Sequence, residues 1–172
     1  PRRLLHRRAE LREADAADAP QRSLRPSERA LFAVLALFVA WQILMPLRHL
    51  LYPGDVSWTE EGHRFSWRMK LRDKDGWVTF TVSSPSARTS WEVDTSDLLQ
   101  PWQEDEMAGR PDMILQFAHF LAEESERQGF AGVEVHARSR VSLNGRKLQP
   151  LIDERVDLAQ QPRSVLPAAY IL

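Results

Sequence analysis

The chain has 172 residues, enough for one modest domain and a tail but not for several hydrophobic cores. Its formal net charge of −1 excludes the strongly basic composition that is typical of a nucleic-acid-binding domain. The absence of cysteine excludes a disulfide framework, a zinc ribbon and thiol catalysis within this sequence. Because the chain begins with Pro1 rather than Met, we interpret it as the C-terminal fragment of a longer membrane protein.

An apolar run of membrane length lies near the N-terminus. Residues 30–47 read ALFAVLALFVAWQILMPL, with Gln42 as the only polar side chain. About 18 residues at about 1.5 Å each extend roughly 27 Å, close to the hydrocarbon thickness of a bilayer. Ser27 is a suitable helix N-cap, and Pro46 is expected to kink or end the helix. The sequence therefore predicts a transmembrane helix over 28–51.

The flanks of this run differ in charge. Residues 1–27 are rich in arginine, and by the positive-inside rule this tail is expected to stay cytoplasmic. The long polar lead and the missing small-residue cleavage site disfavour a signal peptide. Arg48, His49 and Tyr52 suit the headgroup layer. Residues 52–172 are then expected to form an extracytoplasmic domain of an integral membrane protein, which we expect in the bacterial inner membrane.

Beyond the span the pattern changes to a period of two residues. A first strand is predicted over 65–71, with an apolar face that consists of Phe65, Trp67, Met69 and Leu71. Asp75-Gly76 predicts a hairpin turn and 77–82 the return strand. Residues 85–88 are expected to form a loop before another short strand at 90–93.

The second half of the outer domain predicts a helix and a second hairpin. Pro111 suits a helix start, and Gly129 suits its C-terminal cap. A strand is predicted over 133–143, and Asn144-Gly145 should turn the chain back into 147–152. The apolar face of the helix consists of Ile114, Phe117, Ala118 and Leu121. The fold class is thus α+β: one transmembrane helix, then a mainly antiparallel, sandwich-like β-sheet domain with a covering helix.

Several dispersed segments resemble one known family. They are Ser57-Trp58-Thr59, Phe65-Ser66-Trp67-Arg68-Met69, Pro111-Asp112-Met113, Val141-Ser142-Leu143-Asn144-Gly145-Arg146 and Ile152-Asp153-Glu154-Arg155-Val156-Asp157. In this order they resemble the vitamin K-dependent gamma-glutamyl carboxylases, especially bacterial members of the HTTM type. The chain departs from the animal enzymes at Phe65, Arg68 and Arg140, where those have a tyrosine, an aspartate and an aromatic residue.

The resemblance implies carboxylation of protein glutamyl residues in the outer half of the membrane. It implies a reduced vitamin K or menaquinone-type quinone, O2 and CO2 as cofactors, with the activating lysine and most of the quinone pocket in other transmembrane helices of the parent protein. The implied partners are membrane lipid, those remaining helices and a glutamate-containing polypeptide, with no nucleic acid. The alternative is a non-catalytic, membrane-anchored β-domain for partner binding or assembly.

The candidate substrate-binding residues come from two segments that the resemblance covers: Trp58, Arg64, Phe65, Ser66, Trp67 and Arg68, and then Asp153 and Arg155. Arginine can bind a carboxylate through two hydrogen bonds. Phe65, Trp67 and Met69 have an alternative role as core residues of a half-buried strand, and the arginines as part of a solvated face.

We expect no catalytic residue in the fragment. Lys70, Lys74 and Lys147 fall on predicted polar faces or turns, and a catalytic lysine needs burial to lower its pKa. The histidines lack ligand spacing for zinc, so no metal site is expected. Asp153, Arg155 and Asp157 predict a salt-bridged turn, with docking against the membrane-side cleft as the alternative. Arg138 and Arg140 form either a solvated face or a stripe that attracts an acidic peptide.

Overall fold

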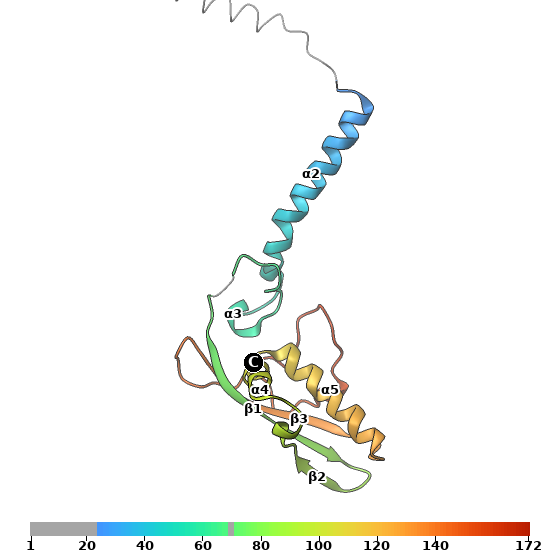
Figure 1. Ribbon diagram of the computed structural model, residues 1–172, viewed down its shortest axis with the longest axis vertical. Coiled ribbons are helices and arrows are strands. Elements are labelled where there is room, and N and C mark those ends of the chain that lie inside the picture. The colour runs from blue at the N-terminus through green and yellow to red at the C-terminus, as the bar shows by residue number, and fades with distance from the viewer. Residues whose placement is uncertain (1–23, 69–70) are drawn as a thin grey trace, which may run out of the picture. The chain divides into compact units, whose positions relative to one another are not determined.

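The computed structural model describes residues 24–68 and 71–172 (Figure 1). Its contacts divide the chain into two compact units, one that ends at Gln42 and one over Ile43–Leu172. Most of the predicted tail over 1–27 lies outside the described residues, as do Met69 and Lys70.

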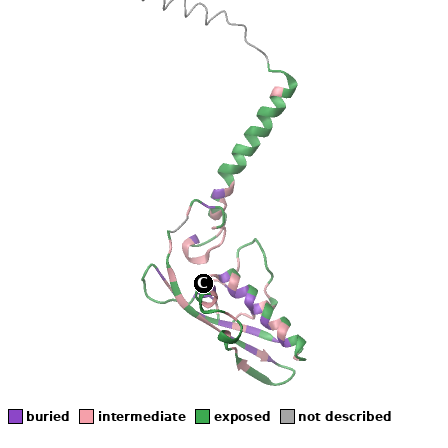
Figure 2. Cartoon of the chain, in the orientation of Figure 1, coloured by how far each residue is buried: buried purple, intermediate pink, exposed green. Residues whose placement is uncertain are grey.

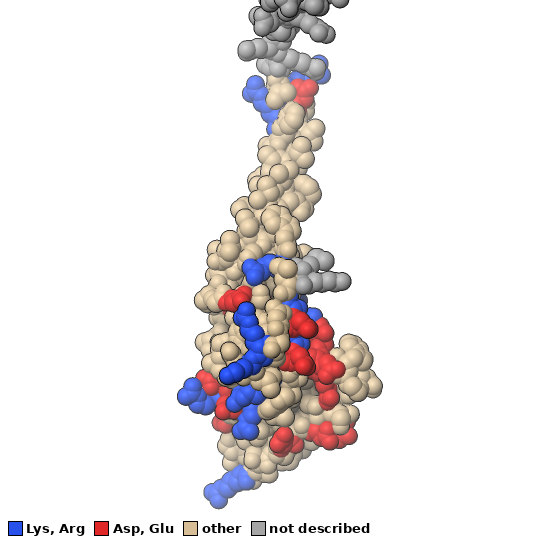
Figure 3. All heavy atoms as spheres, turned by 90° about the vertical axis from the view of Figure 1, so that its left-hand side faces the viewer, with Lys and Arg blue, Asp and Glu red and all other residues tan. Residues whose placement is uncertain are grey.

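Helix α2 spans Pro26–Leu47, and the 3-10 helix η1 continues it over Arg48–Leu51. An 18-residue window of the combined segment has a mean hydropathy of 2.3, and by length and composition the segment can cross a membrane. The helix begins one residue before the expected N-cap Ser27, with the Arg25 backbone N–H donating to Glu28 Oε2 at 2.8 Å. On the face in Figure 3, charged side chains flank the apolar part of α2 without interrupting it.

A three-stranded antiparallel sheet organises the second unit. Its strands are β1 (Lys74–Ser84), β2 (Thr89–Glu92) and β3 (Glu134–Leu143), in the order β2-β1-β3. Strand β1 pairs with β3 from Lys74↔Leu143 to Ser83↔Glu134. It also pairs with β2, to which the short loop at 85–88 connects it. The predicted loop at 85–88, the short strand after it and the strand at 133–143 are confirmed.

The core lies between one face of the sheet and helix α5 (Pro111–Arg127), which Figure 2 shows with buried residues at intervals along its length. The predicted apolar face of this helix is buried, and the Phe80 and Phe117 rings meet edge to face with centroids 5.0 Å apart. Gly129 follows the helix with φ 96°, as expected of a C-terminal cap glycine. The α+β class is confirmed.

The alternating residues Val135, Ala137, Val141 and Leu143 of β3 are buried, and the same face includes one polar residue. Ser139 is 1% exposed, and its Oγ accepts the backbone N–H groups of Leu151 and Ile152 at 3.2 and 3.1 Å. These bonds hold the chain after β3 against the sheet.

The predicted strand over 65–71 is wrong. Phe65 has φ 64°, in the left-handed region, and Ser66 bonds back to the His63 carbonyl through its N–H and its hydroxyl. Phe65, Trp67 and Leu71 are 75, 70 and 60% exposed, so their alternation does not mark a core face. The interpretation of Phe65 and Trp67 as core residues is therefore wrong as well.

The predicted hairpin turn at Asp75-Gly76 is also wrong, since both residues lie inside β1 opposite Ser142 and Val141. A Cβ on Gly76 would lie 2.2 Å from the Arg140 carbonyl oxygen, so this glycine permits close approach of two strands.

The second hairpin is reduced to a turn and a single bridge. Asn144 and Gly145 have φ 52° and 72°, as a tight turn requires. Among the described residues, the return segment pairs with β3 only through the bridge Val141↔Gln149, and its Ile152 bridges Ile171 instead. Among the described residues, four elements were not predicted: helices α3 (Val56–Thr59) and α4 (Pro101–Ala108) and the 3-10 helices η2 (Thr95–Asp97) and η3 (Leu158–Gln160). Helix α4 has weak apolar periodicity, and its buried residues are Met107 and Ala108 at its end.

Candidate functional site

The segment that follows η1 contains six of the eight candidate substrate-binding residues. It begins with helix α3 (Val56–Thr59), where Asp55 Oδ1 accepts the Ser57 N–H at 2.8 Å and this bond lowers the pKa of Asp55. The other two candidates, Asp153 and Arg155, follow β3. Within the described residues, no hydrogen bond or ion pair joins these two to the first six.

Trp58 and Ser66 are fixed by contacts that leave them little freedom to bind a ligand. Trp58 Nε1 donates to the Leu172 carbonyl at 2.7 Å, and its indole packs against the core. Ser66 is 8% exposed, and its hydroxyl donates to the His63 carbonyl at 2.6 Å. Both residues therefore stabilise the segment, and their hydrogen-bond donors are already used within the protein.

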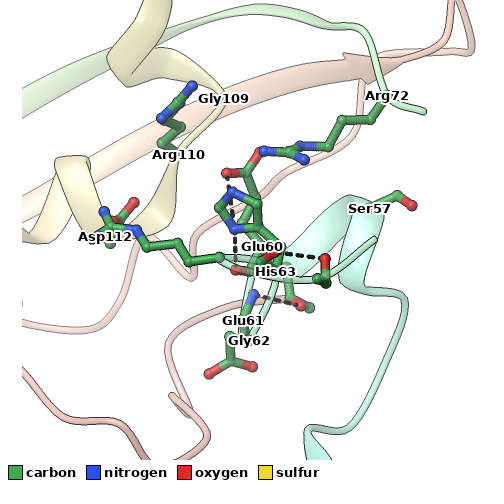
Figure 4. Close-up of polar contacts among 12 residues, drawn as sticks. Ser57, Glu60, Glu61, Gly62, His63, Arg72, Gly109, Arg110 and Asp112 are labelled. Carbon is green, nitrogen blue, oxygen red and sulfur yellow. Dashed lines mark hydrogen bonds and ion pairs between the residues drawn. The ribbon is translucent and has the colours of Figure 1, made fainter. Parts of the chain in front are cut away.

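Glu60 of this segment forms a buried cluster of charged side chains with Arg72 and Lys74. Glu60, in the left-handed conformation at φ 62°, places its carboxylate 2.7 Å from Arg72 Nε and 3.3 Å from Lys74 Nζ. Figure 4 shows Arg72 reaching Glu60, with the His63 ring beside it. The side chains of Glu60 and Lys74 are each 6% exposed. Glu60 Oε2 is buried and has no hydrogen-bond partner among the described residues.

Lys74 is the centre of this cluster. Its ammonium donates to the carbonyls of Trp58 at 2.5 Å and Gly109 at 2.7 Å, besides its contact with Glu60. An ammonium has three donor hydrogens, so these three oxygens satisfy it. The prediction that Lys74 lies on a polar face or turn is wrong: it links α3, β1 and the α4–α5 connection. The sequence Lys-Asp-Gly is typical of a turn, so it gave no indication that Lys74 is buried.

Burial is the largest single influence on the pKa values of Lys74 and Glu60, but it decides the direction of the shift only for Lys74. It lowers the pKa of Lys74 from 10.5 to about 8, although the Glu60 carboxylate acts in the opposite direction. Burial also raises the pKa of Glu60, but the Arg72 hydrogen bond and the charges of Lys74 and Arg72 outweigh it, so the net pKa is lowered. At neutral pH the cluster is therefore ionised and internally compensated, which suits a structural tie better than a general base.

A cavity of about 280 Å³ opens beside the cluster. It is lined by Glu60, Arg72, Asp73, Lys74, Asp105, Glu106, Gly109 and Arg110. Arg110 pairs with Glu106 of α4, so the basic groups of this wall already have acidic partners.

The three candidate arginines differ in how firmly they are paired. Arg64 Nη2 lies 2.6 Å from Asp112 Oδ2, and Arg155 makes two contacts of 3.1 Å with Asp153. Arg68 donates to the Ser57 hydroxyl at 3.2 Å and lies 3.9 Å from Asp55. Arg68 is therefore the least engaged of the three.

The second charged segment is a structured turn, as predicted. Asp153 and Arg155 form the ion pair described above, while Asp157 Oδ1 accepts the N–H groups of Val135 and Ala159 at 2.9 and 3.0 Å. Asp157 thus caps η3 and fixes the start of β3, a role that its charge pattern alone did not indicate.

The face of the sheet opposite α5 has a cavity of about 380 Å³. Its lining residues are Trp77, Thr79, Thr81, Glu92, His136, Ala137, Arg138 and Glu154. Arg138 Nε lies 3.0 Å from Glu154 Oε2, and Arg140 donates to the Ser139 carbonyl at 3.0 Å. The stripe of Arg138 and Arg140 is therefore partly neutralised in this structure.

Comparison with known proteins places the chain in a family. The family model for the lumenal domain of vitamin K-dependent gamma-carboxylase matches residues 27–172. No curated protein and no solved structure gives a significant match. The match covers α2 and the whole outer domain, and it fits a membrane protein with an extracytoplasmic domain. The chain belongs to the vitamin K-dependent gamma-carboxylase lumenal-domain family.

Proposed function

We propose that this chain is part of a membrane-bound gamma-carboxylase and positions a glutamate-containing polypeptide for carboxylation. The family match over 27–172, which includes an apolar helix and the domain after it, carries this proposal. The parent protein would supply the remaining transmembrane helices and use a reduced vitamin K or menaquinone-type quinone with O2 and CO2. We place it in a bacterial inner membrane with the N-terminal flank cytoplasmic.

Neither of the two larger cavities described above fits the quinone itself. The cavities of about 280 and 380 Å³ are lined mainly by polar and charged side chains, whereas a naphthoquinone ring needs apolar walls. Lys74, the buried lysine, has all its donors engaged. We therefore assign to this domain the positioning of the polypeptide, and we assign the chemical steps to the remaining transmembrane helices.

Arg68 is the side chain that best suits contact with a glutamyl carboxylate. Its side chain is 40% exposed, and its nearest carboxylate, on Asp55, lies 3.9 Å away. A substrate carboxylate can approach more closely and take two hydrogen bonds from the guanidinium. Arg64 and Arg155 would each have to exchange an existing partner at 2.6 or 3.1 Å.

Carboxylation by the full-length protein tests the proposed activity. Purified protein in membranes is incubated with a reduced naphthoquinone, labelled bicarbonate and a glutamyl peptide. We expect label in the peptide only when quinone and oxygen are both present. A correctly folded full-length protein that transfers no label under these conditions would contradict the proposal.

The same preparation tests the role of Arg68. We expect Arg68→Ala to weaken peptide affinity about tenfold, a loss of about 1.4 kcal/mol, because the contact is already made in the ground state. The melting temperature should change little, since the side chain is partly exposed and loosely paired. Arg127→Ala is the control, because Arg127 is an exposed arginine of α5 that pairs with Glu124 at 2.7 Å, and it should leave peptide affinity unchanged. Equal affinities for the wild type and Arg68→Ala would remove Arg68 from the site.

A further inference from the structure

Three short segments of the second unit expose large apolar side chains. These are Leu50 (71% exposed), Leu51 (82%), Phe65 (75%), Trp67 (70%), Val165 (83%) and Leu166 (71%). The surface of a soluble monomeric protein rarely exposes a large apolar patch unless the patch binds a protein, a ligand or a membrane. The segments lie far apart in sequence, so their proximity has to come from tertiary contacts.

Contacts with η1 and the residue after it join these segments. The Tyr52 hydroxyl donates to the Val165 carbonyl at 2.5 Å, which brings 165–166 to the end of η1. Arg48 Nε donates to the Gly62 carbonyl at 3.3 Å, and its guanidinium carbon lies 5.9 Å from the centre of the Phe65 ring. Both exposed apolar pairs are therefore attached to η1, which begins where α2 ends.

The loop around Gly62 packs directly on Tyr52. A Cβ at Gly62 would lie 2.7 Å from the Tyr52 ring, and the residue has φ 66°, so glycine allows both the turn and the close approach.

The backbone holds the Phe65 side chain outside the core. A bulky residue at φ 64° is unfavourable and persists only where its surroundings impose it. The two bonds from Ser66 to the His63 carbonyl, at 2.9 and 2.6 Å, impose this turn.

We propose that Phe65, Trp67, Val165 and Leu166 enter the outer leaflet of the bilayer and form a second membrane contact of the outer domain. The bilayer is the occupant because these residues are attached to η1, whose own Leu50 and Leu51 continue the membrane helix. Aromatic rings and an arginine such as Arg48 are the side chains that favour the membrane–water interface. This contact holds the loop of Arg64–Arg68 at the membrane surface, and it does not depend on the proposed carboxylase function.

The lack of cysteine makes this proposal directly testable. Single substitutions Phe65→Cys, Trp67→Cys, Val165→Cys and Leu166→Cys are introduced into the full chain and labelled with bimane. The labelled protein is reconstituted in phosphatidylcholine vesicles that contain lipid with a doxyl group near the headgroup. Trp102→Cys and Leu148→Cys are the controls, because these side chains are 68 and 54% exposed and, among the described residues, neither forms a hydrogen bond or ring contact with η1.

We expect the doxyl lipid to quench the four test positions at least threefold more than the two controls, and aqueous iodide to show the reverse order. Quenching by iodide at control level would overturn the proposal. Shielding from both quenchers would also overturn it, because a second copy or another helix would then cover the surface.

A charge variant checks that the label does not create the contact. With bimane at Leu166→Cys, Trp67→Glu should reduce doxyl quenching at least twofold, whereas Trp102→Glu should not. Trp67 is 70% exposed, so this change removes no core packing. Unchanged quenching in the Trp67→Glu variant would show that the segments do not enter the bilayer together and would overturn the proposal.

Discussion

Lys74 shows how one buried cation can hold several elements together. Its three oxygen partners come from the end of α3, from Glu60 just beyond it and from the residue after α4. Lys74→Met should lower the free energy of unfolding by roughly 2–4 kcal/mol, because two carbonyls lose their donor while Glu60 keeps Arg72. Urea unfolding in detergent measures the loss. Lys147→Met, at an exposed position, should stay within about 0.5 kcal/mol. Similar losses in both variants would argue against a structural tie.

The titration of Lys74 and Tyr170 should give stability two opposite slopes at alkaline pH. The Lys74 pKa is about 8 when folded and 10.5 in its ordinary state, so between these values the unfolded chain binds more protons and stability rises with pH. Burial, with the charges of Asp112 and Glu61, raises the Tyr170 pKa from 10.0 to about 12, so stability falls over that interval.

Melting temperatures between pH 7 and 12 measure both effects. Lys74→Met should remove the rise above pH 8, and Tyr170→Phe should remove the fall above pH 10. A wild-type curve that falls steadily from pH 8 would contradict the assignment to Lys74.

At the scale of elements, the contact between β1 and β3 depends on a glycine. An alanine Cβ at Gly76 would lie 2.2 Å from the Arg140 carbonyl oxygen and 2.8 Å from Val141 Cα. Both neighbours are backbone atoms of the paired strand and cannot move aside as a side chain can. We expect Gly76→Ala to cost about 3 kcal/mol, at the upper end of overpacking penalties. Asp75→Ala, next to it and exposed, should cost less than about 0.5 kcal/mol. Equal stability of both variants would favour a turn at this position.

The elements that sequence predicted are those whose apolar pattern is produced by burial. Helix α5 and strand β3 pack against each other, so their periods of 3.6 and 2 residues match their buried faces. The alternation over 65–71 does not arise from burial, since Phe65 and Trp67 are exposed and the Phe65 ring lies against Arg48 of η1. The Asp75-Gly76 pair resembles a turn, but pairing with β3 overrides that local preference. Patterns alone do not distinguish these cases.

The candidate site was predictable as a segment but not as an arrangement. The resemblance selected Trp58 and Arg64–Arg68, which the structure keeps within one region after η1. It did not select Glu60 or Lys74, because their roles arise from contacts across the fold. The three arginines also differ in their ion pairs, which the sequence does not indicate. Arg64 and Arg155 are paired with nearby carboxylates, and Arg68 is more loosely held.

At the scale of the whole molecule, the distribution of arginine predicts that the outer domain lies across the membrane from the arginine-rich tail. Arginine is frequent before residue 30, at positions 2, 3, 7, 8, 12, 22, 25 and 29. After Leu51 the first arginine is Arg64. We therefore expect a single insertion with the tail in the cytoplasm. A fusion of alkaline phosphatase after Gly129 should be active, and a fluorescent-protein fusion there that folds only in the cytoplasm should be dark. Replacing Arg22, Arg25 and Arg29 with alanine should weaken this orientation, since these charges lie nearest the span. A bright cytoplasmic reporter after Gly129 in the unaltered chain would contradict the orientation and, with it, contact of Trp67 with the outer leaflet.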